Sequence, residues 1–430
     1  MAHTLDKAFL KAQDPEQHAA LTIGAVAVVD GTVPDRETFK RLLAERVQSV
    51  PRCTQLMRTP TFEWIDDPEF EVANHVRRLV VPRPGDDAQL SQAIAYALER
   101  PLDLSRPLWE CWVIEGLKGN RWAILVKTHH DVADGNSAAH LLARLCDDAG
   151  NDVFANLPGA PQISRASAQM PGWAHTLRRA YAMAGTMVGS MWPAEHLSAD
   201  RVMRRYATVR VPIADVDRVC RKFGVAVNDV ALAAITEGFR RVLLSRGEEP
   251  RADSLRTLVP TAVRSPVLPY LPVEHDDPVL QLRTVHNRWK VQHKRQASFV
   301  EAAINCLPTM LRTNVLQLLA RLPHTGLVTL GTHAPGPRHQ LRLMGQTMER
   351  LLPIPPTAVQ LSTGVAVLSY GDDLVFGITT AHDAALDVKQ LAAGIELGMA
   401  RLVALSDDSV LLFSDHRRRR SSRASGGAPR

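Results

Sequence analysis

Residues 122–145 read WAILVKTHHDVADGNSAAHLLARL, and three patterns follow one another in this stretch. Five consecutive apolar residues at 122–126 predict a buried strand, and the apolar spacing over 138–145 predicts a helix. The polar segment HHDVADG at 129–135 lies between them. Because a strand-to-helix loop holds its side chains on a rigid base and leaves them accessible, we expect the chemistry of this protein at 129–135.

Strands and helices alternate on both sides of this stretch. The segments ECWVIEGL at 110–117 and RWAILVKT at 121–128 bracket the turn GLKGN and predict a β-hairpin. Apolar residues at helical spacing predict a helix at 36–48 and another that ends before Pro101. The other predicted elements are strands at 22–29, 255–260, 326–330, 363–370 and 374–380, and helices at 229–247, 278–294, 308–320 and 386–405.

The apolar rhythm fails between 149 and 170, where Pro, Gly, Ala and Ser dominate, and this composition is typical of a linker. A Met-rich helix is expected next, at 172–192. The fold class that follows is α/β (α+β), with two mixed domains facing each other. The predicted limits are 1–150 for the N-terminal domain, 151–206 for linker and crossover helix, 207–410 for the C-terminal domain and 411–430 for a basic tail.

Composition excludes several classes of protein. A chain of 430 residues with 45% hydrophobic residues forms large cores, and no apolar run reaches the length of a membrane span, so we expect a cytoplasmic protein. The five cysteines lack metal-ligand spacing, and Cys111 and Cys146 are expected in the core. The net charge of +6 resides in the last 14 residues, which hold six arginines and no acidic residue. This tail is expected to be solvated or attracted weakly to a membrane surface, and no nucleic-acid partner is expected.

The segment HHDVADG suits general-base chemistry. A histidine at the end of a buried strand is held rigidly, and its ordinary pKa of about 6.5 leaves it able to accept a proton at neutral pH. Gly135 allows a close backbone approach, and Asp134 can hold the loop by accepting hydrogen bonds or pairing with an arginine. The alternative is that His129 and His130 are ordinary loop residues and that Asp134 caps the next helix. Two histidines, an aspartate and a glycine together favour the catalytic interpretation.

The same residues allow two other kinds of site, a metal centre and a hydrolase. A metal could be held by His129, His130, Asp134 and His140, but adjacent histidines seldom converge on one ion and no HExxH spacing is present, so no metal is expected. A serine hydrolase is disfavoured because the chain has no GxSxG segment. Of the three kinds of site, HHDVADG therefore favours general-base catalysis without a covalent intermediate.

At this point the residues carry a resemblance. HHxxxDG resembles the signature of the CoA-dependent acyltransferase superfamily, and the chain as a whole resembles the bacterial wax ester synthase/diacylglycerol acyltransferase family up to about residue 405. The segments that carry the resemblance, in order, are LDKAFL at 5–10, FEWIDDPEFEVANHVR at 62–77, PLDLSRPLWE at 101–110, VNDVALAA at 227–234, LVPTAVR at 258–264, LPVEHDDPVLQLR at 271–283 and VLSYGDDLVFG at 367–377.

The resemblance implies two chloramphenicol-acetyltransferase-like domains facing each other across a tunnel. It implies transfer of a long-chain acyl group from acyl-CoA, as co-substrate, to diacylglycerol or a fatty alcohol, with no bound cofactor. His130 would be the general base beside His129, and Asp134 would support the loop through an arginine, for which Arg264 is the candidate. A lipid-droplet or membrane surface would supply the acceptor.

Other positions match the motifs of the family and also have ordinary structural interpretations. Pro107, Leu108 and Trp109 match the PLW motif, although a tryptophan at a strand start is commonly core. Asn228 and Asp229 match the ND motif, and Asn228 also stands where a helix N-cap is expected. Either set could line the tunnel.

The chain also departs from the family pattern. Asp131 follows the histidines where a small apolar residue is usual, the segment at 265–270 is short, and His333 replaces an asparagine. Two alternatives therefore stay open: an acyltransferase for another lipid or polyketide hydroxyl, and a divergent non-catalytic lipid-binding protein.

Overall fold

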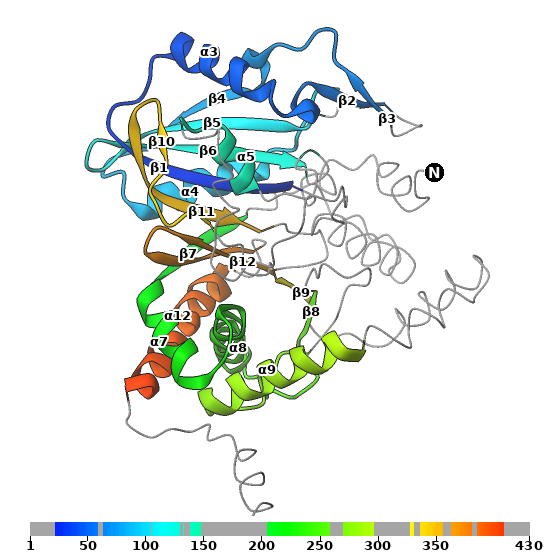
Figure 1. Cartoon of the computed structure of the whole chain (residues 1–430), viewed down its shortest axis with the longest axis vertical. Helices are drawn as coiled ribbons and strands as arrows, with labels where there is room; N and C mark the ends of the chain where they lie inside the picture. Colours follow the sequence, from blue (N-terminus) through cyan, green and yellow to red (C-terminus); the bar gives the residue numbers. More distant parts are fainter. Residues whose placement is uncertain are drawn as a thin grey trace, which may run out of the picture.

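Two β-sheets form the centre of the molecule in this computed structural model (Figure 1). The structure describes residues 22–58, 63–103, 105–129, 132, 138–147, 204–258, 270–295, 327–330, 336–355, 363–380 and 385–407. The strands are β1 (Thr22–Asp30), β2 (Gln55–Arg58), β3 (Glu63–Asp66), β4 (Val76–Val80), β5 (Trp109–Leu117), β6 (Arg121–His129), β7 (Arg205–Pro212), β8 (Arg256–Leu258), β9 (Leu327–Leu330), β10 (Arg342–Leu343), β11 (Gln346–Ile354), β12 (Thr363–Tyr370) and β13 (Asp373–Thr380). The helices are α3 (Arg36–Val47), α4 (Asp87–Glu99), α5 (Ala138–Arg144), α7 (Ile213–Phe223), α8 (Val227–Ser245), α9 (Pro278–Arg295) and α12 (Ala385–Asp407), with short 3₁₀ turns at Pro51–Cys53 and Val72–His75.

The first sheet has six strands in the order β10-β11-β1-β6-β5-β4. The predicted hairpin forms its centre: β5 and β6 pair antiparallel, and β1 pairs antiparallel with β6 along its whole length. The core strands β1, β5 and β6 are buried on both faces, because α3 and α5 cover one face and α4 packs on the other. This double burial explains why their sequences read as continuous apolar runs.

The C-terminal half of the chain supplies two strands of this first sheet. Strand β11 pairs antiparallel with β1, and β10 pairs with β11. Residues 342–354, which the predicted division assigns to the C-terminal domain at 207–410, therefore complete the sheet of the other half. The physical reason is that β1 would otherwise be an exposed edge, and its unpaired N–H and C=O groups find partners in β11.

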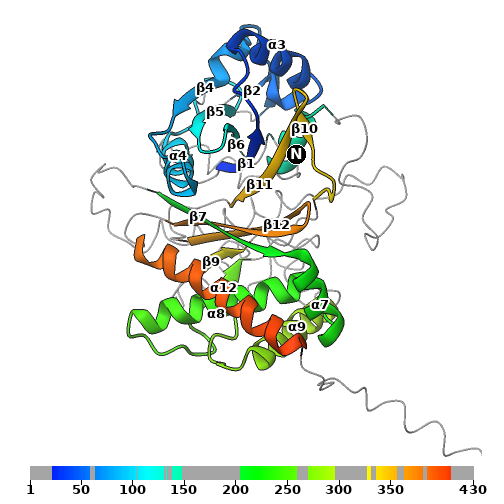
Figure 2. The ribbon, with the colours of Figure 1, turned by 90° about the vertical axis from the view of Figure 1, so that its left-hand side faces the viewer.

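The second sheet has five strands in the order β7-β13-β12-β9-β8. Helices α7, α8, α9 and α12 cover one face, and Figures 1 and 2 show them on the side turned away from the first sheet. The opposite face meets β11: Tyr206 donates its hydroxyl to the Pro353 carbonyl at 3.0 Å. A Cβ on Gly377 would lie 1.8 Å from the same carbonyl oxygen. The two halves thus face each other as predicted, in direct contact along β11.

Most elements predicted within the described residues are confirmed, including the helices α3, α4, α8, α9 and α12 and the strands β1, β5, β6, β12 and β13. Cys111 and Cys146 are core residues, each 0% exposed. Local patterns did not predict β2, β3, β4, β7, α7 or the β10–β11 pair. The expected linker, the helices at 172–192 and 308–320 and the tail at 411–430 lie outside the described residues.

Candidate active site

Strand β6 ends at His129 and α5 begins at Ala138, so the predicted strand before HHDVADG and the predicted helix after it are confirmed. His129 is 3% exposed. Its backbone N–H donates to the Leu108 carbonyl at 2.8 Å, and its own carbonyl accepts the N–H of Val132 at 3.0 Å. The first histidine of the pair is therefore a buried residue fixed on both sides by its backbone.

The other residues of the predicted catalytic loop lie outside the described residues. These are His130, Asp131, Asp134 and Gly135. Arg264, the segment 265–269 and His333 also lie outside, so the proposed contact between Asp134 and an arginine stays a prediction.

The PLW segment contacts the end of the histidine-bearing strand. Pro107, Leu108 and Trp109 are buried, and the Leu108 carbonyl accepts both the His129 N–H and, at 3.2 Å, the Thr128 hydroxyl. These contacts place the PLW segment beside the His129 end of β6 and show that its main chain has a structural role there.

Trp109 is fixed by two ring contacts. Its indole Nε1 donates to the Cys53 carbonyl at 2.7 Å, and its ring stacks on His75 with 4.5 Å between centroids. The His75 Nδ1 lies 2.9 Å from the Trp109 carbonyl, which fixes the imidazole as a donor at that nitrogen. Burial lowers the pKa of His75, because the charged imidazolium would lose its hydration there.

The ND segment lies at the start of α8, in the other half of the molecule. Helix α8 begins at Val227, so Asn228 is inside its first turn and the predicted N-cap role is wrong. Asp229 explains the earlier start: its carboxylate accepts the Ala226 N–H at 3.1 Å and holds the helix entry closed. The same carboxylate oxygen lies 2.8 Å from the His286 Nδ1 on α9. Asp229 is 6% exposed, so its described contacts are those of a helix anchor.

A buried ion pair that was not predicted lies close to His129. Lys127 on β6 is 0% exposed, and its Nζ lies 2.8 Å from the Glu110 Oε2 on β5. The signal was present in the sequence: a lysine interrupts the apolar run before the histidines, and a glutamate ends PLWE.

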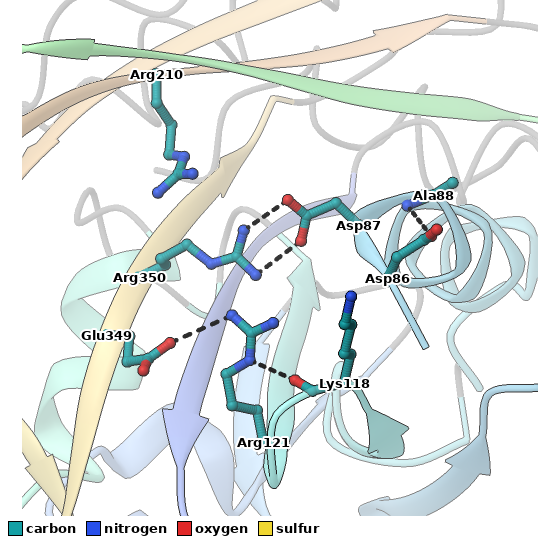
Figure 3. A pocket seen from close by; sticks show the side chains of 8 residues that line it. All are labelled: Asp86, Asp87, Ala88, Lys118, Arg121, Arg210, Glu349 and Arg350. Atoms are coloured by element: carbon teal, nitrogen blue, oxygen red, sulfur yellow. Dashed lines mark hydrogen bonds and ion pairs between the residues drawn. The ribbon is translucent and has the colours of Figure 1, made fainter. Parts of the chain in front are cut away.

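Figure 3 shows a cavity of about 560 Å³ that Arg121, the first residue of β6, lines. At the usual rise of a strand, Arg121 is about 26 Å from His129 at the other end of β6. Four of the charged side chains of the cavity form two pairs: Arg350 holds Asp87 through two hydrogen bonds of 2.8 and 3.0 Å, and Arg121 contacts Glu349 at 3.4 Å. The lining residues are Asp86, Asp87, Ala88, Lys118, Arg121, Arg210, Glu349 and Arg350. The distance and the pairing make this cavity a junction between α4, β6 and β11, separate from the histidine loop.

Metal sites and membrane spans can be assessed only over the residues that the structure describes. Across the described ranges, no group of three or more His, Cys, Asp or Glu side chains could hold a metal ion. Helices within the same ranges are too short or too polar to cross a membrane.

Comparison with known proteins adds to this geometry. Residues 3–202 match the wax ester synthase/diacylglycerol acyltransferase catalytic domain, and residues 265–402 match the corresponding C-terminal domain. A putative diacylglycerol O-acyltransferase of Mycobacterium tuberculosis (strain ATCC 25618 / H37Rv) is 59% identical over 434 residues, covering 99% of this chain and 96% of its own. A probable diacylglycerol O-acyltransferase of the same organism is 44% identical over 442 residues, covering 94% of this chain and 96% of its own.

Solved structures show the same fold. The wax ester synthase/diacylglycerol acyltransferase from Marinobacter aquaeolei VT8 aligns with a TM-score of 0.67 at 21% identity, over 94% of this chain and 99% of its own. The first condensation domain of the calcium-dependent antibiotic synthetase aligns with a TM-score of 0.57 at 14% identity, over 95% of this chain and 98% of its own. Their similarity extends to both halves, so the two-sheet architecture is the common feature.

Proposed function

The chain belongs to the wax ester synthase/diacylglycerol acyltransferase family, and we propose that it transfers a long-chain acyl group from acyl-CoA to the hydroxyl of diacylglycerol, with a fatty alcohol as a second acceptor. One observation carries this proposal: HHDVADG occupies the connection between β6 and α5, inside the range that matches the catalytic domain of the family. The relatives that are 59% and 44% identical are named for diacylglycerol acyl transfer, which favours that acceptor.

In the proposed reaction His130 is the general base. Its imidazole takes the proton of the acceptor hydroxyl as that oxygen attacks the thioester carbonyl carbon, and the tetrahedral oxyanion forms. When the carbonyl reforms, the C–S bond breaks and the proton passes to the departing CoA sulfur. The acyl group has then moved from the CoA sulfur to the acceptor oxygen as an ester, and the hydroxyl proton has moved to the sulfur. A thioester is activated already, so neither an enzyme nucleophile nor a bound cofactor is needed.

The remaining loop residues have supporting roles in this proposal. Gly135 lets the backbone turn closely between strand and helix, and Asp134 holds the loop by pairing with Arg264. His129 is a structural neighbour of the base. Its burial and its hydrogen bond to Leu108 support that assignment.

The test is an assay of the purified protein with labelled palmitoyl-CoA against diacylglycerol, hexadecanol and water, measuring ester product and CoA release. We expect triacylglycerol and wax ester from the parent and a fall of about 10² to 10⁴ in rate for His130→Ala. Two outcomes would refute the proposed acceptors: CoA release into water with no ester formed from either lipid, or no CoA release with either lipid. Equal esterification by His130→Ala and the parent would refute the assignment of the base.

We also propose weak attachment to an anionic lipid surface, because diacylglycerol dissolves in bilayers and droplets. The arginine tail at 417–430 and the Met-rich segment at 172–192 are the candidate contacts, and each arginine near an anionic surface contributes about 1 kcal/mol. Deletion of 417–430 should weaken flotation with anionic vesicles and reduce its dependence on salt. Identical flotation with and without the tail, at low and high salt, would remove this proposal.

A further inference from the structure

Lys127 joins three elements at the point where β6 approaches the histidine loop. Its ammonium donates to the carbonyl oxygens of Ala97 at 3.0 Å and Arg100 at 2.7 Å, both at the C-terminal end of α4. Its third contact is the ion pair of 2.8 Å with Glu110 on β5. All three N–H donors of the ammonium can therefore be used, although the side chain is fully excluded from water.

Glu110 is also committed on both carboxylate oxygens. It lies directly opposite Lys127 in the register of β5 and β6. Its Oε2 accepts the indole N–H of Trp112 at 3.0 Å, and its Oε1 lies 3.7 Å from the Arg77 guanidinium on β4. The Lys127 ammonium lies 5.8 Å from the centre of the Trp112 ring as well. The pair is thus enclosed by β4, β5, β6 and α4.

The fold alone does not require charges at this place. Side chains at 123, 125, 127 and 129 share one face of β6, and Ala123 and Leu125 belong to an apolar core. Removing two charges from water costs several kcal/mol per ion, and well-packed apolar pairs commonly replace such an ion pair without loss of stability. Burial accordingly lowers the pKa of Lys127, and Glu110 opposes that shift. What the ion pair supplies is directional contact between elements, which apolar side chains would not supply.

We propose that Lys127 and Glu110 are a positioning pair for the acyltransferase reaction: they fix the end of β6, from which the histidine loop continues, against α4 and β5. The next residues along β6 bear this out, since Thr128 and His129 are both bonded to the Leu108 carbonyl, two residues before Glu110. General-base catalysis needs the imidazole within a few tenths of an ångström of its productive position. Loosening the contacts at the end of β6 should therefore lower kcat more than it weakens substrate binding. The inference rests on the proposed function.

The main test is the neutral double variant Lys127→Met with Glu110→Gln. The glutamine can still accept the Trp112 N–H, and no unpaired buried charge remains. The Ala97 and Arg100 carbonyls lose a donor, so we expect a lower melting temperature, and kcat is measured well below it. We expect kcat for palmitoyl-CoA and diacylglycerol to fall at least tenfold, with KM for palmitoyl-CoA within twofold of the parent. A double variant that retains both stability and kcat would overturn the proposal.

A second variant keeps the test valid if the double variant folds poorly. Glu110→Asp retains the charge but withdraws the carboxylate by about one bond length, so the ion pair can form only if β5, β6 or α4 moves. We expect reduced kcat with unchanged KM in this variant. Unchanged kcat would count against the proposal in the same way.

The matched control is Glu237→Gln on α8. Glu237 is a buried glutamate, 5% exposed at its side chain, and it lies 3.5 Å from Arg401. Since this pair is in the other half of the molecule, the variant should lose stability and keep kcat.

Hydrogen exchange separates this proposal from the proposed function. Amide protons of His129 and Val132 should exchange at least tenfold faster in the double variant, while amides within α8 keep the rates of the parent. If the parent makes no ester, the proposed function fails, and this measurement still decides whether Lys127 and Glu110 hold the strand end. Unchanged exchange at His129 and Val132 would overturn the positioning role.

Discussion

The Leu108 carbonyl accepts the backbone N–H of His129 at 2.8 Å, so the PLW segment and the histidine pair share a hydrogen bond. His129 ends β6 and Leu108 directly precedes the antiparallel strand β5, so the bond lies just beyond the pairing of Trp109 with Thr128. The PLW motif at 107–109 therefore contacts the histidine pair through its main chain. Side chains that stabilise the contact between Leu108 and the end of β6 should therefore raise turnover without touching the substrate.

The Thr128 hydroxyl gives the first prediction. Thr128→Val removes the donor to the Leu108 carbonyl and should lower the free energy of unfolding by about 1 kcal/mol, because one buried acceptor loses a partner. Turnover should fall as well. The matched control is Thr236→Val in α8, whose hydroxyl donates to the Leu232 carbonyl at 2.7 Å. Urea unfolding should show similar losses for both variants, and equal turnover in the two would contradict the prediction.

Trp109 should be a stabilising residue. Trp109→Phe removes the N–H that satisfies the buried Cys53 carbonyl, and we expect a loss of about 1–3 kcal/mol in the free energy of unfolding. Trp64→Phe is the comparison, because Trp64 is only half-buried and its ring lies 5.1 Å from the Arg52 guanidinium. Urea titration followed by circular dichroism measures both. A smaller loss at Trp109 than at Trp64 would show that the indole N–H has little importance.

Asp229 distinguishes a helix anchor from a substrate contact. Asp229→Ala removes the acceptor for the Ala226 N–H and the partner of His286, so the melting temperature should fall. At temperatures well below melting, kcat and KM should match those of the parent. A fall in kcat with an unchanged melting curve would instead place Asp229 in the substrate path.

His140 gives a pH dependence of stability. Burial, and secondarily the charge of Arg144, lower the pKa of His140 to about 4, against about 6.5 in an unfolded chain. The unfolded state therefore binds the proton more tightly, and the free energy of unfolding should decrease as pH falls from about 6.5 to about 4. His75, whose pKa is also lowered by burial, contributes a slope of the same sign. His140→Gln should reduce the slope in urea unfolding measured from pH 7 to 4. An unchanged slope would mean that His140 does not contribute.

Gly377 tests the contact between the sheets. A Cβ at this position would overlap the Pro353 carbonyl oxygen, so Gly377→Ala should force β13 away from β11 and yield little soluble protein. The control is Gly371→Asn in the β12–β13 turn, where nothing lies within 4 Å and φ is +56°. Asparagine tolerates that conformation, and the variant should fold. Comparable soluble yields from the two variants would contradict the close contact.

Local patterns predicted the elements that lie next to their partners in sequence. The β5–β6 hairpin follows from two apolar runs around a glycine turn, and α5 follows from the spacing after the histidine loop. The histidine loop itself could be located for the same reason, between a buried strand and a helix. The start of α8 was misplaced by two residues, because Asp229 closes the helix entry through the Ala226 N–H and Ala226, in place of Asn228, is the N-cap.

Long-range pairing explains what the sequence could not supply. QTMERLLPI at 346–354 alternates poorly, because β11 meets β1 at its edge and the second sheet on its face. The Lys127–Glu110 pair depends on strand register and on the end of α4, neither of which local spacing specifies. Helix α7 could have been predicted from the sequence, since Val216, Val219 and Phe223 share one helical face and Gly224 follows as a C-cap.

The insertion of β11 beside β1 constrains how the chain is synthesised and folded. Strand β1 leaves the ribosome more than 300 residues before the strand that completes its sheet, so the N-terminal half must wait with an open edge until residue 354 has been made. Such distant pairing slows folding and leaves an edge to which a second nascent chain could add. A gene cut within 151–203 should yield an N-terminal fragment that aggregates alone. The same fragment should become soluble when the C-terminal fragment is co-expressed with it.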